Sequence, residues 1–320
     1  MSPSLTNGNI VSMTPGARMM LGIAIGDAFG ARFENQVRES VTLDGEERTY
    51  HTRNQYTDDT QMTVAVSELL ISGLALTGSN LADALIGAYR RDPRSGYSEV
   101  TRGMLELSAN GAEFLRCLPD DEIAKRRSDG SAMRAIPIGL LPDLNDVIRF
   151  ASVSSAISHG HPDAIAATVG VALLAHDRYY TGRPFSKSLK EIIGLIPNLT
   201  SSTEAYFNQV LAGWNPEIIL EEYENYGVPY TESRIFFGAV IAILARFGED
   251  PYRALLEAVR LGGDTDTTAS VILGAALIRP GAQTLPEELI IGLENGPYGR
   301  DFLIAIGDQL SAKFPPDRIR

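Results

Sequence analysis

The sequence contains a single cysteine, Cys117, among its 320 residues. One thiol cannot form an internal disulfide, and it cannot build a zinc site that needs two or more thiolates. A chain without disulfides has no need of an oxidising compartment, so we expect a cytoplasmic protein.

Basic charge and long apolar runs are also scarce. Lys and Arg total 28 against 40 Asp and Glu, which gives a formal net charge of −12. This balance argues against binding to nucleic-acid backbones or anionic lipid, although metal ions could still make a local site attractive to a nucleotide. No apolar run reaches the roughly 18 residues that a membrane-spanning helix requires. Residues 1–14 lack the basic start and apolar stretch of a signal peptide, and we expect them to form a flexible tail.

Helical periodicity dominates the rest of the chain. One apolar helix face repeats at i, i+3, i+4, i+7 and i+8, at Met62, Ala65, Val66, Leu69 and Leu70. Pro and Gly separate further segments of this kind, and convincing period-2 strands are lacking. No repeat or shift in composition marks a second domain. We therefore predict an all-α fold, with a single compact multi-helix domain over residues 15–320.

Two polar stretches interrupt the helical pattern, at residues 36–56 and 116–131. Both read as loops, and the second carries a basic trio, Lys125, Arg126 and Arg127. Loops of this length often line binding sites, but a solvated surface loop explains the composition equally well.

An acidic cluster, Thr57, Asp58 and Asp59, stands directly before the apolar helix face that begins at Met62. Asp and Thr at such a place often cap the helix by accepting hydrogen bonds from its free N–H groups. One aspartate is enough for a cap, and two adjacent aspartates flanked by threonine carry more negative charge than capping needs.

A second cluster, Asp264, Asp266 and Thr267, follows two glycines and precedes a helix rich in small residues. Carboxylate and hydroxyl oxygens are hard ligands that suit Mg²⁺, Mn²⁺ or Ca²⁺ rather than zinc. If the two clusters met in space, they would supply four carboxylates, enough to neutralise two divalent ions. The residues alone support an oxygen-ligated metal pair and little more.

The motifs together resemble the ADP-ribosylglycohydrolase family, which includes dinitrogenase reductase-activating glycohydrolase and eukaryotic ADP-ribosyl-acceptor hydrolases. The matching pieces occur in family order: Gly22–Gly30 with Glu34, Thr57–Met62, Asp92–Tyr97, Gly130–Arg134 with Pro137–Gly139, Ser158–Pro162, and Gly262–Thr267. The resemblance implies an all-α domain with a central dinuclear metal cleft. It also implies hydrolysis of the bond between ADP-ribose and an acceptor, on a protein Arg or Ser or on a small molecule.

Site residues follow from the same resemblance. It implies a pair of Mg²⁺ or Mn²⁺ ions ligated by Thr57, Asp58, Asp59, Asp264, Asp266 and Thr267. It gives catalytic roles to Glu34, Asp58 and Asp59, and substrate contacts to Gly96, Tyr97, Gly130, Ser131, Met133, Arg134 and His159. Asp27, within the first motif, reads either as a buried structural aspartate or as a direct participant, and we leave it outside the site.

Several of these residues have a second interpretation that involves no ligand. Glu34 could be a surface charge, Arg134 a structural ion-pair partner, and Tyr97 a loop anchor. His159 is expected near the substrate, whereas His161, before Pro162 at a helix start, is expected to be structural.

The chain departs from the family pattern at the nucleotide end. Asp129 stands where many members have Asn, and Ser98 replaces the second Gly of a Gly-Tyr-Gly motif. No aromatic residue lies between Phe114 and Arg134 to hold adenine, so an arginine of the basic trio would have to stack on the base.

Two other functions therefore stay open beside ADP-ribosyl hydrolysis. One is a non-catalytic member that binds ADP-ribose or serves a structural, crystallin-like role. The other is a hydrolase of a different ribosyl or phosphorylated metabolite. The expected partners are an ADP-ribosylated substrate and the ADP-ribose product, without nucleic acid or membrane; the sequence leaves the oligomeric state open.

Overall fold

The computed structural model describes residues 10–43, 54–213, 232–279 and 285–318. These residues form α-helices and short 3-10 helices, with two isolated β-bridges and no strand among them. The helices are α1 Pro15–Gly30, α2 Asp58–Ser72, α3 Gly78–Arg91, α4 Glu99–Leu107, α5 Gly111–Phe114, α6 Asp120–Ile123, α7 Leu144–Ala156, α8 Pro162–Tyr180, α9 Phe185–Leu195, α10 Ser201–Ala212, α12 Ser233–Phe247, α13 Pro251–Arg260, α14 Thr265–Ile278, α15 Glu287–Gly292 and α16 Arg300–Lys313. The predicted all-α, single-domain fold is confirmed.

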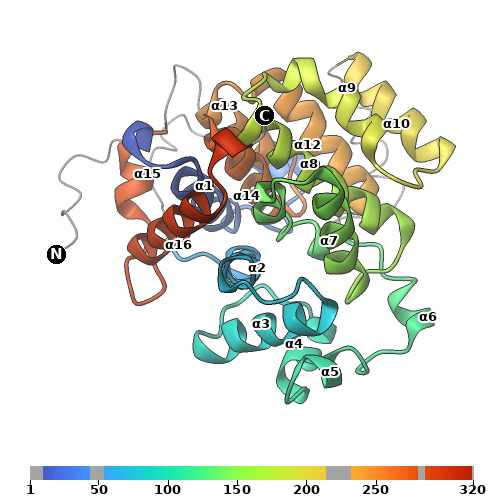
Figure 1. The fold of residues 1–320 in the computed structure, drawn as a ribbon. Coiled ribbons are helices and arrows are strands. Elements are labelled where there is room, and N and C mark those ends of the chain that lie inside the picture. Colours follow the sequence, from blue (N-terminus) through green and yellow to red (C-terminus); the bar gives the residue numbers. More distant parts are fainter. Residues whose placement is uncertain (1–9, 44–53, 214–231, 280–284, 319–320) are drawn as a thin grey trace.

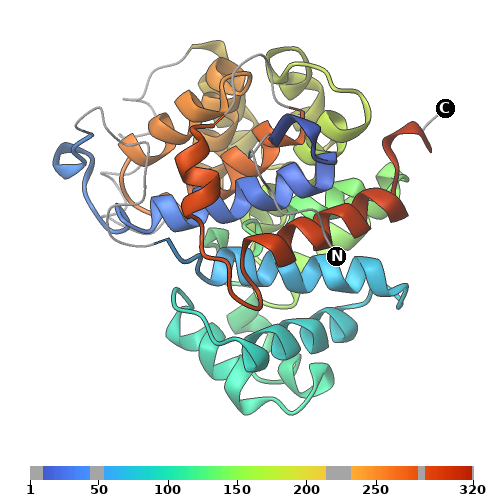
Figure 2. The ribbon, with the colours of Figure 1, turned by 90° about the vertical axis from the view of Figure 1, so that its left-hand side faces the viewer.

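Helix α2 lies between two groups of helices. On one side are α1, α14 and α16, and on the other is a smaller layer formed by α3, α4 and α5 (Figures 1 and 2). Helices α7 to α10 and α12 lie on the remaining side of α1 and α14 (Figure 1). Every residue of α14 is buried, as are nearly all residues of α1. This burial explains why both helices are apolar all round rather than on one face.

Glycines let α1 and α14 approach backbone to backbone. A Cβ at Gly22, Gly26 or Gly30 would lie 2.7, 2.3 or 2.4 Å from a main-chain carbonyl oxygen of α14. The glycines recur every four residues and so form one face of α1. This glycine face brings Asp27, in the last turn of α1, next to the residues that begin α14.

The expected tail and loops fall partly outside the described residues. Residues 1–9 of the tail and 44–53 of the first polar stretch lie there. Within the tail, Ile10–Ser12 form a 3-10 helix, and the side chain of Ile10 is buried. The second polar stretch contains the single-turn helix α6 and the 3-10 helix Asp129–Ser131. None of the helices described is long and apolar enough to cross a membrane.

Candidate active site

The start of α2 is capped by a side chain from another helix. Thr57 has extended backbone angles, but its own side chain accepts no capping hydrogen bond. Asp27 of α1 takes over this role: one carboxylate oxygen accepts from Thr57 Oγ1 at 2.8 Å, and the other accepts from Thr60 N at 3.0 Å and Thr60 Oγ1 at 2.6 Å. The amide of Thr57 also donates to the carboxylate, at 2.9 Å. Asp27 therefore fixes the turn that presents Asp58 and Asp59.

The start of α14 is fixed mainly by backbone contacts. Gly262 and Gly263 both have left-handed φ angles, +73° and +72°, which glycine adopts without a steric penalty. Gly263 N donates to Gln36 O at 2.8 Å, and Asn35 N donates to Gly263 O at 2.9 Å. Thr265 Oγ1 donates to Gly30 O at 2.8 Å. The turn at Glu34 is thereby held against the second acidic cluster.

The two helix starts bring buried carboxylates together. Asp27, Asp59 and Asp266 each offer an oxygen within 4.8 Å of the others. Burial raises the pKa of Asp58, Asp59 and Asp266 well above the ordinary value, and the charge of neighbouring carboxylates adds a smaller effect in the same direction. Burial also raises the pKa of Asp27, against the opposing effect of its hydrogen bonds from Thr60 and Thr57.

This cluster suits a divalent cation. Asp59 Oδ1 is buried without a hydrogen-bond partner among the described residues, although buried polar atoms are nearly always paired. Clustered, desolvated carboxylates are costly unless a cation neutralises them. Their oxygens are the ligands that Mg²⁺ and Mn²⁺ prefer, so Asp27, Asp59 and Asp266 could hold a metal ion.

A cavity of about 600 Å³ extends from the acidic cluster. Twelve of the fourteen predicted site residues line it, and they come from six separate sequence motifs. They are Glu34, Asp58, Asp59, Gly96, Tyr97, Gly130, Met133, Arg134, His159, Asp264, Asp266 and Thr267. The remaining two, Thr57 and Ser131, do not line it: the Thr57 hydroxyl donates to Asp27, and Ser131 hydrogen-bonds Ser155 and Thr168 in the interior.

Gly96 and Tyr97 form one wall of this cavity. Gly96 has φ +107°, and a Cβ there would lie 1.9 Å from Asp58 Oδ1, so any larger residue would displace that carboxylate. The hydroxyl of Tyr97 donates to Gln61 Oε1 at 2.7 Å, and its ring meets Tyr89 edge to face. Tyr97 is therefore held rigidly from behind while it faces the cavity.

We call the part of the lining formed by Ser128, Gly130, Met133, Arg134 and His159 the far end of the cavity. It contains a buried arginine that is bound to protein atoms. Arg134 donates to Ser154 O at 2.6 Å, to Ser158 Oγ at 2.9 Å and to Gly130 O at 3.2 Å. The described residues offer it no carboxylate partner, which leaves the ion-pair interpretation without support. Burial lowers the pKa of Arg134 to about 10. The geometry favours a positioning role for this residue, because its donors already hold the Gly130 turn against α7.

The basic trio lies outside the cavity lining. Lys125 pairs with Asp121 and Glu122 on the surface, and Arg127 pairs with Glu232. Arg126 donates to Thr101 Oγ1 at 3.1 Å. Thr101 belongs to the described lining of the cavity, whereas Arg126 does not.

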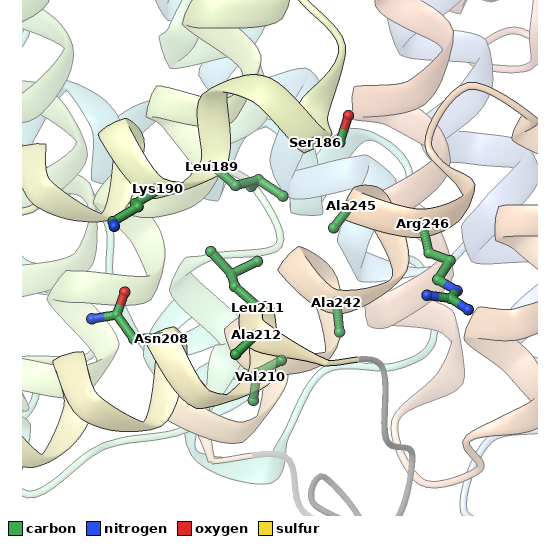
Figure 3. A pocket seen from close by; sticks show the side chains of 10 residues that line it. All are labelled: Ser186, Leu189, Lys190, Asn208, Val210, Leu211, Ala212, Ala242, Ala245 and Arg246. Carbon is green, nitrogen blue, oxygen red and sulfur yellow. The ribbon is translucent and has the colours of Figure 1, made fainter.

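A second cavity, of about 650 Å³, lies between α9, α10 and α12 (Figure 3). Its described lining includes Leu189, Val210 and Ala242, with Lys190 and Arg246 at its edges and no acidic side chain among the residues that the structure describes. It contains none of the predicted site residues. The chemistry therefore assigns the site to the slightly smaller, acidic cavity.

Comparison with known proteins agrees with this geometry. The model of the ADP-ribosylglycohydrolase family matches residues 16–319. The chain belongs to the ADP-ribosylglycohydrolase family. Its relatives in this family include an uncharacterised protein of Archaeoglobus fulgidus, 25% identical over 303 residues, which cover 91% of this chain and 94% of the relative.

Human ADP-ribosylhydrolase ARH3 is 23% identical over 320 residues, covering 84% of this chain and 86% of ARH3. Among solved structures, an ADP-ribosylglycohydrolase-related protein complex has a chain that superposes with a TM-score of 0.69 at 21% identity, covering 93% of this chain and 97% of that one. At this identity the structural likeness shows the fold. Family membership supports ADP-ribosyl hydrolase activity in general terms.

Asp27 is the residue of the acidic cluster that our predicted site left out. A signal was present in the sequence, because Asp27 is the single charged residue of the apolar segment Gly22–Gly30. A charge inside a helix that is otherwise apolar all round must find partners. His161, expected to be structural, caps α8 by accepting from Asp163 N at 3.2 Å.

Proposed function

We propose that the chain is a Mg²⁺- or Mn²⁺-dependent hydrolase that cleaves the glycosidic bond between ADP-ribose and an acceptor. The observation that carries this proposal is the position of the buried carboxylate cluster at one end of a cavity that Glu34 also lines. The acceptor would be a protein Arg or Ser side chain or a small ADP-ribosylated molecule, so the reaction would reverse ADP-ribosylation. We place the protein in the cytoplasm.

The two acidic clusters would hold the metal pair. We assign ligation to Thr57, Asp58, Asp59, Asp264, Asp266 and Thr267. Asp27 adds a carboxylate to the same cluster and keeps the α2 start in place. When bound, divalent ions would orient hydroxyls of the ribose and lower the pKa of a bound water.

The position of Glu34 supports a role as proton acceptor. Its carboxylate is exposed and lines the cavity, and the turn that carries it is held through Asn35 to Gly263. We propose that Glu34 positions the attacking water and takes a proton from it. Glycosidic cleavage develops oxocarbenium-like positive charge, which the nearby carboxylates Asp58 and Asp59 would stabilise.

The far end of the cavity would hold the remainder of the substrate. Gly96 and Tyr97 would contact the ribose from one wall. Gly130 and Met133 would contact the diphosphate and distal ribose, with Arg134 and His159 supporting that turn from behind.

Release of ADP-ribose from arginine-linked and serine-linked substrates, measured with Mg²⁺ and with EDTA, tests the proposal. We expect release from at least one substrate, and only with the metal. Tight binding of ADP-ribose without release from any acceptor would instead indicate a non-catalytic ADP-ribose-binding protein.

A hydrolase of another ribosyl or phosphorylated metabolite is a second candidate. It is favoured by the scarcity of cationic side chains at the far end: of the described residues lining the cavity, only Arg134 is cationic, and it donates to protein atoms. Faster cleavage of a ribosyl substrate that lacks the adenosine diphosphate would support this candidate over ADP-ribosyl hydrolysis.

A further inference from the structure

A chain of buried polar groups connects the interior to the far end of the cavity. Arg134 Nη2 donates to Ser158 Oγ at 2.9 Å, and Ser158 Oγ lies 2.9 Å from His159 Nδ1. His159 Nε2 in turn lies 3.0 Å from Ser128 Oγ. Arg134, Ser158 and His159 are at most 3% exposed, whereas Ser128 lines the cavity. The chain therefore ends at the place where a ligand would lie.

The hydrogen-bond chemistry gives this chain a direction. A guanidinium group only donates, so Ser158 Oγ accepts from Arg134. Its hydroxyl hydrogen is then free for His159 Nδ1, the other partner that the structure shows for this oxygen. An Nδ1 that accepts carries no hydrogen, so in the neutral ring the hydrogen is on Nε2. Nε2–H then donates to Ser128 Oγ, and the hydrogen of Ser128 is left to point elsewhere.

The opposite tautomer fits less well. If Nδ1 carried the hydrogen, Ser158 Oγ would accept from both neighbours, and its own hydrogen would have no acceptor within the described structure. Ser158 is 1% exposed, and a buried hydroxyl without an acceptor is costly. A doubly protonated ring is disfavoured as well, because burial and the charges of Arg126 and Arg134 lower the pKa of His159 well below its ordinary value.

We propose that Ser128 is a ligand-binding residue whose hydroxyl, oriented by His159, donates to a phosphoryl oxygen of the substrate. This inference rests on the proposed function, since it names the residue that meets the diphosphate. His159 and Ser158 are positioning residues for it. Space at the turn is consistent with this arrangement: a Cβ on Gly130 would lie 3.1 Å from the His159 ring, so glycine lets the turn close on the histidine.

The described lining of the cavity offers few cationic donors to a phosphoryl group. Its described side chains include no lysine, and the guanidinium of Arg134 is engaged by Ser154 and Ser158. A phosphoryl group bound there would therefore rely on hydroxyl and backbone N–H donors. Ser128 is the lining hydroxyl that the hydrogen-bond chain leaves with a hydrogen to donate.

The first test is spectroscopic and needs no ligand. Long-range ¹⁵N–¹H correlation spectra of the metal-loaded protein distinguish a protonated from an unprotonated imidazole nitrogen. We expect His159 to be the Nε2–H tautomer, assigned by comparison with His159→Gln. In Ser158→Ala, Nδ1 loses its hydroxyl donor, and we expect the His159 resonances to shift or to report both tautomers. An Nδ1–H tautomer in the unmodified protein would overturn the proposed direction.

The second test measures binding of ADP-ribose and of inorganic pyrophosphate by calorimetry in the presence of Mg²⁺. We expect Ser128→Ala to weaken both by roughly ten- to hundred-fold, the usual loss for a hydrogen bond to a charged group. Ser152→Ala, a serine of α7 that donates to Ile148 O, is the matched control and should bind as the unmodified protein does. Unchanged affinity in Ser128→Ala would refute the assignment.

A double-mutant cycle separates orientation from simple structural damage. If Ser158 acts through Ser128, Ser158→Ala should weaken pyrophosphate binding, and adding it to Ser128→Ala should cause no further loss. Independent, additive losses would contradict the positioning role. Binding of pyrophosphate without ADP-ribose would reject the proposed function while Ser128 remains supported, whereas binding of neither would reject both.

Discussion

The starts of α2 and α14 carry the same kind of residues but are held in different ways. The α2 start is held by a side chain: Asp27 of α1 accepts hydrogen bonds from Thr57 and Thr60. The α14 start is held mainly by the backbone: two glycines adopt left-handed φ angles, and Gly263 exchanges main-chain hydrogen bonds with the segment that carries Glu34. One acidic start is thus fixed by a buried charge and the other by chain conformation.

This difference has a consequence for the site. The α2 start depends on a group that itself belongs to the carboxylate cluster, so its geometry and the charge of the site are coupled. The α14 start depends on a turn that also carries Glu34, so its geometry is coupled to the position of the proposed proton acceptor. Substitutions at the two starts should show whether each start depends on its own contacts.

Removing one carboxylate from each start should have the largest effect. We expect Asp58→Ala and Asp266→Ala each to reduce kcat/KM by about a thousandfold or more, because each deletes a proposed metal ligand and ligand loss costs several kcal/mol of transition-state stabilisation. Helical circular dichroism should persist in both. Collapse of the helical signal would mean that these carboxylates are structural, and a loss in only one variant would mean that the two starts do not contribute equally.

Asp27→Ala should loosen the α2 start more than the α14 start. It leaves two hydroxyls and two amides of Thr57 and Thr60 without their acceptor, so we expect urea unfolding to show a loss of about 3 kcal/mol or more. Amide hydrogen exchange should quicken more at Thr60 than at Thr268, whose amide donates to Asp264 O within the other start, because the global loss affects both amides and the lost contacts affect only the first. Equal acceleration at both amides would show that the two starts are not held independently.

Mg²⁺ should stabilise the protein more as the pH rises. Burial and mutual repulsion raise the pKa of Asp58, Asp59 and Asp266, so the metal-free folded state binds more protons than the unfolded chain. Stability without metal therefore falls as pH increases from about 4 through the raised pKa values. Mg²⁺ competes with those protons, and at a hundred times Kd it should add about 2.7 kcal/mol. Thermal unfolding at several pH values, with Mg²⁺ or EDTA, measures this; a Mg²⁺ effect that shrinks as pH rises would contradict it.

Gly262→Ala should disturb the α14 start by a smaller amount. The new Cβ would lie 2.5 Å from Gln36 O, and the alanine would have to adopt a left-handed φ. We expect a loss of about 2 kcal/mol in urea unfolding, of which left-handed strain supplies about 1 kcal/mol. Gly73→Ala is the matched control, because Gly73 has φ +79° and its Cβ would meet only Lys313 Nζ at 3.6 Å. Equal losses in the two variants would mean that the contact with Gln36 is unimportant.

The sequence predicted the helical fold and both acidic helix starts because these depend on local patterns. The apolar face beginning at Met62 and the glycines before Asp264 are visible without any tertiary information. That both clusters line one cavity followed from their chemistry and from the family resemblance. Asp27 was missed, because its role depends on the contact between α1 and α2, which no local pattern records.

The far end of the site depends in the same way on contacts that no local pattern records. The contact of Arg134 with the substrate stays a prediction: the residue lines the cavity, but it is fully buried and donates to α7 and the residues that follow it. The arginines at 126 and 127 were expected to supply a stacking surface, but their partners are Thr101 and Glu232, which lie 25 and 105 residues away in the chain. Composition identifies cationic side chains, whereas their direction depends on distant partners.

The glycine face of α1 fixes the distance between α1 and α14, and with it the spacing of the carboxylates in the candidate site. With no side chain between the two backbones, substitutions cannot tune the separation of α1 and α14 in small steps: any residue larger than glycine pushes them apart, and none can bring them closer. A register shift would move Asp27 along α14 by about 1.5 Å per residue, a large error for the residue that holds the proposed metal ligands of α2 in place. The contact between α1 and α14 thus sets the spacing of the carboxylates. Substitutions should be tolerated more readily around the cavity's far end than along this helix contact.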